Sequence, residues 1–191
     1  MRAPSPGQPR AICAYSRLMA GRDEWPEPPR LNSLRLMLEP LQVRHAEEMA
    51  PLLDDLRLYA FIGVEPATLE ELRERYGRQV VGCSPDGAQR WLNWVLRRRE
   101  DERAIGTVQA TVTGCGTDLT AEVAWMLGTA HQNQGYAREA ARTMVTWLRQ
   151  RGVGTIIAHV HRRHEASAAV ATALGLSPTS TVVDGEVRWQ A

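Results

Sequence analysis

A strand-to-helix junction in the second half of the chain limits its folding more than any other feature. The run from Ala121 to Leu127 is strand-like, and an amphipathic helix with apolar residues at helical spacing begins after it. Between them lies the segment His-Gln-Asn-Gln-Gly-Tyr-Ala-Arg, residues 131–138. Gly135 lets the backbone approach a ligand closely, and the first helical turn offers unpaired N–H groups and the positive end of a dipole. The junction therefore predicts an anion site suited to a phosphate or pyrophosphate.

The same junction carries a motif. Gln132-x-x-Gly135-x-Ala137 resembles the Q/R-x-x-G-x-G/A loop of the GNAT superfamily, the acyl-CoA-dependent N-acyltransferases. The resemblance implies that acetyl-CoA is the co-substrate and that the loop amides hold its pyrophosphate, with contacts from Gln132, Asn133, Gln134, Gly135, Tyr136, Ala137 and Arg138. It also implies that the backbone around Met126 and Leu127 contacts the pantetheine arm and the acetyl carbonyl. The alternative is a helix N-terminus in some other α/β domain.

A second signature follows the junction. His164-Glu165-Ala166-Ser167, with Leu174-Gly175 at the end of the next helix, is similar to an Asn-x-x-Ser/Ala segment followed by Leu-Gly-Phe. That pattern belongs to the GNAT branch with the bacterial ribosomal-protein N-terminal acetyltransferases. Ser167 and Leu174-Gly175 fit the pattern, whereas His164 stands where the branch has Asn. The resemblance implies that His164 and Ser167 lie beside the pantetheine.

The order of expected elements agrees with this family. Strands are expected at 34–38, 89–98, 104–113, 120–128 and 155–161, with a final hairpin turning at Asp184-Gly185, and helices at 44–54, 68–81, 135–151 and 165–174. We therefore expect an α/β (α+β) GNAT fold over residues 34–191, with a mixed central sheet of about seven strands and about four helices. Residues 1–33 are rich in proline, and we expect a disordered tail or a segment lying over the domain.

Acetyl transfer from a thioester to an amine requires a base, donors for the carbonyl oxygen and a way for the thiolate to leave. Glu122 matches a position where several members of the family keep a glutamate as general base; the alternative is a solvated or arginine-paired charge at a strand start. The family's usual acid is a tyrosine, and Ala171 occupies its place here. Either the thiolate leaves unaided or Ser167 donates the proton.

Two other functions compete with catalysis by acetyl transfer. The missing tyrosine makes a non-catalytic acyl-CoA-binding domain one alternative. The run His159-Val160-His161-Arg162-Arg163-His164 resembles the ligand set of a metallohydrolase. The arginine Arg163 stands where that set has an aspartate and would repel a metal ion, so we expect no metal.

The acceptor is expected to be a primary amine on a small molecule or a peptide. In this fold the acceptor approaches from the side of the first helices and the last hairpin, which makes Tyr59, Phe61, Glu65 and Trp189 candidate walls. The last hairpin is also a candidate interface for a homodimer.

The amino-acid composition excludes several other classes of protein function. The 191 residues carry a net charge of +1, which gives no sign of a nucleic-acid or membrane surface. All basic side chains are arginine, which excludes a phosphate-loop NTPase and Schiff-base chemistry because both need a lysine. Three scattered cysteines and the lack of a long apolar run predict a cytoplasmic protein without a disulfide framework.

Overall fold

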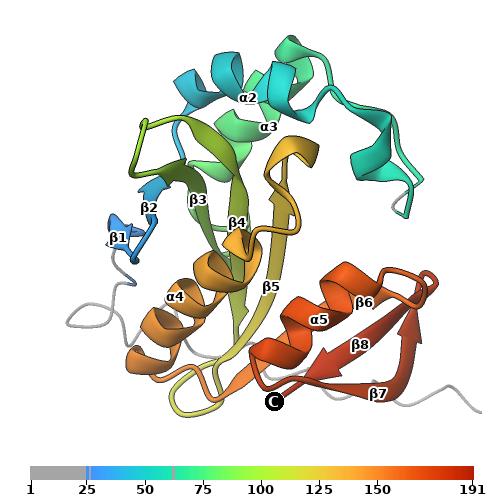
Figure 1. The fold of residues 1–191 in the computed structure, drawn as a ribbon. Coiled ribbons are helices and arrows are strands. Elements are labelled where there is room, and N and C mark those ends of the chain that lie inside the picture. The colour runs from blue at the N-terminus through green and yellow to red at the C-terminus, as the bar shows by residue number, and fades with distance from the viewer. Residues whose placement is uncertain (1–24, 26, 62) are drawn as a thin grey trace, which may run out of the picture.

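The computed structural model describes Trp25, residues 27–61 and residues 63–191, which form one layered domain (Figure 1). Its centre is an eight-stranded sheet with the strand order β1-β2-β3-β4-β5-β6-β8-β7. Neighbouring strands are antiparallel except β5 and β6, which are parallel. This mixed sheet confirms the expected α/β fold.

The strands are β1 (Leu31–Asn32), β2 (Leu36–Pro40), β3 (Arg90–Arg98), β4 (Ala104–Thr113), β5 (Thr120–Leu127), β6 (Thr155–His161), β7 (Ser177–Val183) and β8 (Glu186–Gln190). The α-helices are α2 (Ala46–Leu53), α3 (Leu69–Gln79), α4 (Tyr136–Gln150) and α5 (Glu165–Ala173). Three short 3₁₀ helices, η1 (Val43–His45), η2 (Leu56–Tyr59) and η3 (Thr129–His131), complete the described elements. All four expected helices are confirmed, and no observed end differs from the expected one by more than two residues.

Alternation along the strands divides the interior into two cores. On β3, Leu92, Trp94 and Leu96 face the larger core beneath α4 and α5, whereas Val95 faces a smaller core beneath α2 and α3. Along β5, Val123 and Leu127 belong to the larger core, and Met126 packs at the edge of the smaller one. The cleft described below is lined by residues of both cores.

The sheet opens between its two parallel strands. β5 and β6 are paired only from Thr120 to Glu122 on β5 and from Thr155 to Ile157 on β6. Beyond these three pairs β5 continues along β4 to Leu127, whereas β6 continues along β8 to His161. Figure 1 shows the two strands diverging, with α4 beside β5 and α5 over β6. The free edge of β5 past Glu122 is therefore exposed to the gap.

The N-terminal part of the described chain differs from the sequence expectation. Leu31–Asn32 form the edge strand β1, which the sequence analysis does not predict, and β2 begins at Leu36 because Leu34 lies exposed in the intervening turn. Trp25 packs edge-on against Trp147 of α4, and the Trp94 indole donates a hydrogen bond to the carbonyl of Pro29 at 2.8 Å. Residues 27–33 thus lie over the domain; residues 1–24 are outside the described part.

Candidate active site

The loop before α4 has the backbone geometry of an anion site. Gly135 caps the helix in the left-handed region with φ 80°, and Asn133 has φ 59°. Because the cap residue has no side chain, none fills the space in front of the first-turn N–H groups. These groups point out of a 15-residue helix whose dipole adds positive potential at this end.

Side chains tie the loop to the end of β5. The Gln132 amide donates to the carbonyl of Leu127 at 3.1 Å, and the Gln134 amide donates to the carbonyl of Ala130 at 3.0 Å. Gln132 of the motif therefore acts on the loop's own backbone. This contact fixes the direction in which the chain leaves β5 and enters the loop.

A second set of contacts holds the loop from the outer edge of the sheet. In the turn between β1 and β2, the Arg35 guanidinium donates to Glu139 of α4 at 2.7 Å and to the Gln134 carbonyl at 3.0 Å. The Ser33 hydroxyl and the Arg35 N–H both donate to the same Glu139 carboxylate at 2.7 Å. The Arg35 guanidinium also lies over the ring of Tyr136, 4.4 Å from its centroid. We call these four residues, Ser33, Arg35, Gln134 and Glu139, the loop clamp.

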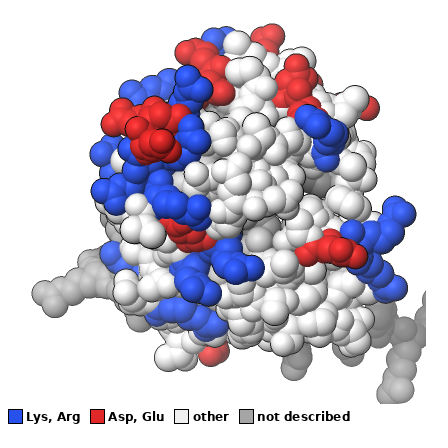
Figure 2. Space-filling view, viewed as in Figure 1, with Lys and Arg blue, Asp and Glu red and all other residues white. Residues whose placement is uncertain are grey.

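Charge gathers around this part of the surface. Figure 2 shows arginines and carboxylates clustered on the side where β1, β2 and the β3–β4 turn lie, while the centre of the same face is nearly free of charge. Much of this charge is paired, since Arg98 pairs with Asp101 and Arg97 pairs with Glu39 and Glu48. The hydrogen bond from Arg98 holds the pKa of Asp101 at about 2, so this carboxylate is ionised at neutral pH.

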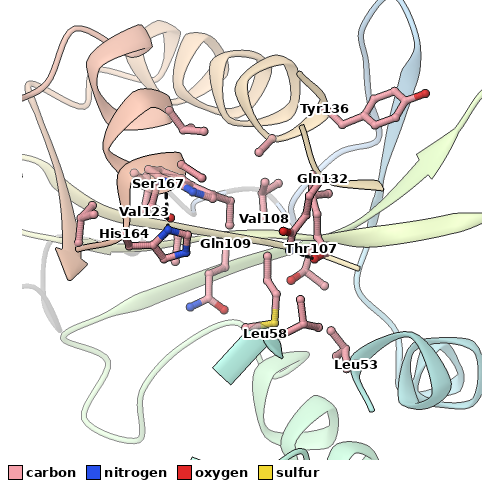
Figure 3. Close-up of a pocket in the computed structure, with 18 of the residues that line it drawn as sticks. Leu53, Leu58, Thr107, Val108, Gln109, Val123, Gln132, Tyr136, His164 and Ser167 are labelled. Atoms are coloured by element: carbon pink, nitrogen blue, oxygen red, sulfur yellow. Dashed lines mark hydrogen bonds between the residues drawn. The ribbon is translucent and has the colours of Figure 1, made fainter. Parts of the chain in front are cut away.

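A cavity of about 670 Å³ joins the loop to the gap between β5 and β6. It is lined by all but one of the residues that the sequence predicted for the site: Glu122, Met126, Leu127, Gln132, Asn133, Gly135, Tyr136, Ala137, Arg138, His164 and Ser167. The exception is Gln134, which is not among the lining residues and whose carbonyl belongs to the loop clamp. Figure 3 shows Ser167 and His164 approaching the cavity from the α5 side and Thr107 and Gln109 from the sheet, with the Tyr136 ring directed away.

β4 approaches the end of β5 unusually closely. A Cβ atom on Gly106 would lie 2.2 Å from the Met126 carbonyl oxygen and 2.6 Å from Cδ2 of Leu127. Gly106 follows a break in the β3–β4 register, and only glycine fits there. The position of the Met126–Leu127 backbone, the stretch expected to contact the thioester, therefore depends on this glycine.

Glu122 lies where the paired part of β5 and β6 ends. Its side chain is 57 % exposed, and its Oε1 is 3.1 Å from Nδ1 of His159 on β6. No pattern in the sequence predicts that these two residues are in contact. Both line the cavity.

His164 is the N-cap residue of α5. Its Nδ1 accepts a hydrogen bond from the Ser167 N–H at 3.4 Å, and its ring stacks on Phe61 at 4.5 Å between centroids. Burial, reinforced by the nearby His161, lowers the pKa of His164 below its ordinary value, which favours the neutral ring as a hydrogen-bond acceptor. Phe61 thus connects the chain before α3 with the far side of the gap.

Some of the residues considered for the general acid and for the walls of the acceptor site line the cavity, and others do not. Ala171, at the usual tyrosine place, is buried in the larger core and outside the cavity lining, whereas Ser167 lines the cavity. Of the four candidate wall residues, Tyr59 and Phe61 line the cavity, while Glu65 does not and Trp189 packs against the larger core.

Tyr76 of α3, which the sequence analysis overlooked, also lines the cavity. Burial raises its pKa to about 12, so it carries a phenol proton at neutral pH.

The histidine run does not assemble into a ligand set. Within the described residues, no group of three or more His, Cys, Asp or Glu side chains lies close enough to hold a metal ion. The Nδ1 atoms of His159, His161 and His164 instead contact Glu122, the Arg163 N–H and the Ser167 N–H respectively.

The sheet with one splayed parallel pair, and the amide-lined loop that opens into the gap, define an acyl-CoA-dependent N-acyltransferase. The model of the acetyltransferase (GNAT) domain matches residues 35–177, and the chain belongs to this family. Its reaction is the transfer of an acetyl group from acetyl-CoA to an amine.

Solved structures with the same fold include several acetyltransferases of low sequence identity. A GNAT-family acetyltransferase from Bacillus anthracis aligns with a TM-score of 0.67 at 16% identity, covering 85% of this chain and 96% of that one. RimL, a ribosomal L7/L12 alpha-N-protein acetyltransferase solved with coenzyme A, aligns with a TM-score of 0.67 at 14% identity, covering 85% and 97%. The microcin C7 self-immunity acetyltransferase MccE, solved with acetyl-CoA and AMP, aligns with a TM-score of 0.67 at 13% identity, covering 83% and 93%.

No curated protein matches the sequence. Among the described residues, none of the helices combines the length and the apolar character that crossing a bilayer requires.

Proposed function

We propose that acetyl-CoA binds with its diphosphate on the first-turn amides of α4 and its thioester along the free edge of β5. The observation that carries this proposal is the single cavity that connects the Gly135 loop, the Met126–Leu127 backbone and Glu122. Among the described residues, no strand pairs with β5 past Glu122 on the β6 side, so its N–H and C=O groups there can bind the pantetheine amides. The N–H groups near Met126 are the proposed donors to the acetyl oxygen, which becomes negative as the amine attacks.

The amine approaches from the side of α2 and α3. Glu122 shares a strand face with Ala124 and Met126, and Met126 packs against the smaller core beneath these helices. The Glu122 carboxylate is therefore on the same side as the proposed acceptor. His164 and Ser167 are proposed to contact the pantetheine from α5, and Ser167 is the proposed proton donor to the leaving thiolate. A thiol has a reference pKa of about 8.5, so a weak donor is sufficient.

The charges on the cavity wall favour an acceptor with one amine. The described wall has the carboxylates Glu122 and Glu186 and the guanidinium groups Arg75 and Arg138. This balance offers little attraction to polycations such as polyamines or aminoglycosides. We propose a primary amine on a small molecule or at the N-terminus of a peptide. RimL and the microcin immunity enzyme share this fold but are named for different roles. The fold therefore does not identify the acceptor, and the proposal depends on the residues that line the cavity.

The test is thiol release from acetyl-CoA with a panel of amino acid amides, short peptides, simple amines, polyamines and aminoglycosides. We expect turnover with at least one monoamine or peptide, and kcat/KM at least about tenfold lower for the polycations, which corresponds to about 1.4 kcal/mol. Binding of acetyl-CoA without thiol release for any amine would indicate the non-catalytic alternative. The best substrate being a polyamine would contradict the proposed acceptor class.

We further propose that two chains pair through β7. This strand is at the edge of the sheet, and all its residues are exposed, including Val182 and Val183. An exposed edge with apolar side chains is a ready surface for pairing with a second strand. Sedimentation analysis should show a dimer that Val182→Lys converts to a monomer; a monomer in the unchanged chain would contradict this.

A further inference from the structure

A carboxylate–imidazole pair lies at the mouth of the gap. Glu122 is paired in register with Ile157, and His159 is two residues further along β6, on the same face. His159 is thus the first residue on this face of β6 after the strands separate. Its side chain is 22 % exposed, and its Nδ1 is 3.1 Å from Oε1 of Glu122.

This contact sets the chemistry of the two ring nitrogens. In the tautomer whose Nδ1–H donates to the Glu122 carboxylate, Nε2 presents a lone pair. A carboxylate that holds an imidazole in this tautomer also stabilises the imidazolium that forms when Nε2 takes up a proton. At neutral pH an imidazole is better matched to accept a proton from an amine than an exposed carboxylate is.

Charged residues of both signs surround the Glu122–His159 pair. Arg188 of β8 is directly opposite His159 in the sheet, and its guanidinium donates to Gln190 at 2.8 Å. The Nε of Arg188 is buried and has no hydrogen-bond partner among the described residues. Arg188 of β8 is the charged group opposite the imidazole in the sheet. The other titratable or charged groups that line the cavity with His159 are Glu122 on β5, His161 on β6, Glu186 on β8, Tyr59 of η2, Arg75 and Tyr76 of α3, Tyr136 and Arg138 of α4, and His164 at the start of α5.

We propose that Nε2 of His159 is the general base of the reaction and that Glu122 is a positioning residue that acts through Nδ1. This inference rests on the proposed function, because it assigns a role within the same acetyl transfer. The amine nitrogen forms a bond to the acetyl carbon, and the carbonyl π electrons move to oxygen. The nitrogen then loses a proton to Nε2, the oxygen electrons return, and the carbon–sulfur bond breaks to release coenzyme A as a thiolate. The imidazolium passes its proton to the thiolate or to water.

The pH dependence of kcat/KM in four chains tests this assignment, with acetyl-CoA and the best amine of the panel. The chains are the unchanged protein, His159→Asn, Glu122→Gln and the double variant. Asn at 159 keeps a donor for Glu122 near the Nδ1 position but has no basic atom. We expect His159→Asn to lower kcat/KM by about 10²-fold or more, with the KM for acetyl-CoA unchanged and the acidic limb of the profile lost.

Glu122→Gln should lower kcat/KM less, by about tenfold, and move the acidic limb to lower pH, because Gln still accepts from Nδ1 but does not stabilise the imidazolium. The double variant should be no worse than His159→Asn alone, since both changes act on one base. His161→Asn, on the same strand face, should keep the acidic limb.

A fall of about 10²-fold in Glu122→Gln together with near-normal kcat/KM in His159→Asn would overturn the assignment, because the carboxylate would then be the base. Equal, additive effects of the two changes would also overturn it. If the unchanged chain binds acetyl-CoA but releases no thiol with any amine, the proposed function fails and this assignment fails with it. Melting temperatures of all chains separate these results from misfolding.

Discussion

Gly135 is the residue on which the anion site depends most. Its φ of 80° is in the left-handed region, and a Cβ there would be 3.5 Å from Nη2 of Arg35, an ordinary contact. An alanine is therefore penalised by backbone strain of about 1–2 kcal/mol rather than by a clash. Gly152 has a similar φ of 86° at the other end of α4 and open space around it, which makes it a matched control.

We predict that Gly135→Ala raises the KM for acetyl-CoA about five- to thirtyfold, because the strain turns the first-turn amides away from the diphosphate. Gly152→Ala should destabilise the fold by a similar amount and leave this KM unchanged. Steady-state kinetics and thermal unfolding of both variants make the comparison. Equal KM values in the two variants would contradict a diphosphate site at Gly135.

His164 predicts a pH dependence of stability. Its pKa in the folded chain is lowered by burial and by His161, so the unfolded chain binds the proton more tightly. Its neutral form therefore contributes stability above the unfolded value of about 6.5, and this contribution is lost as the pH falls through the folded value. His164→Asn keeps a good N-cap residue without the titration.

Denaturant unfolding between about pH 8 and pH 5 should show a smaller loss of stability in His164→Asn than in the unchanged chain. Part of the loss should remain, since burial also lowers the pKa values of His45 and His131. Identical pH curves for the two chains would show that His164 is not held in its neutral form.

At the scale of elements, the close approach of β4 to β5 is the most sensitive packing feature. An alanine at 106 would place its Cβ 2.2 Å from the Met126 carbonyl oxygen and 2.9 Å from Cα of Leu127, and both are backbone atoms of β5 that cannot move aside as a flexible side chain would. Gly106→Ala should therefore destabilise the fold by about 1–3 kcal/mol and lower kcat by displacing the backbone proposed to hold the thioester.

The control is Gly77→Ala in α3, where a Cβ meets nothing within 4 Å. That change should stabilise the chain by up to about 1 kcal/mol and leave kcat unaffected. The prediction for Gly106 fails if its alanine variant has the stability and kcat of the unchanged chain.

The loop clamp joins two elements that are far apart in sequence. The Glu139 carboxylate, only 17% exposed, accepts hydrogen bonds from Ser33 and from both the backbone and the guanidinium of Arg35. Arg35→Ala should raise the KM for acetyl-CoA about three- to tenfold, because the contacts of this partly exposed guanidinium contribute about 1 kcal/mol.

Arg73→Ala is the matched control, since it removes an exposed pair with Glu47 that joins α2 and α3. A double-mutant cycle of Arg35→Ala and Glu139→Gln should show strong coupling in KM. Additive effects would mean that Arg35 acts independently of the clamp.

At the scale of the whole molecule, the sequence predicted those parts whose signal is local. The strand-to-helix junction at Gly135 and the helix expected at 68–81 each depend on residues close together in sequence, and the structure confirms both helices within two residues at each end. η2 could not be assigned, because its apolar run is too short to distinguish a turn from a helix.

Contacts between segments far apart in the chain could not be predicted, because no local sequence pattern indicates them. The Glu122–His159 pair depends on the parallel register of β5 and β6, two strands that are separated in sequence by α4. β1 was hidden because its two residues follow a proline-rich stretch, and Arg35 gave no sign that it would contact Glu139. These features become visible only when the sheet is assembled.

The most direct test of the central claim is a crystal structure of the protein with acetyl-CoA bound. The diphosphate should accept hydrogen bonds from the backbone N–H groups at the start of α4, next to Gly135, and the acetyl oxygen should lie against the backbone near Met126. A bound cofactor whose diphosphate is away from the α4 N-terminus, or whose thioester is outside the gap between β5 and β6, would contradict the account.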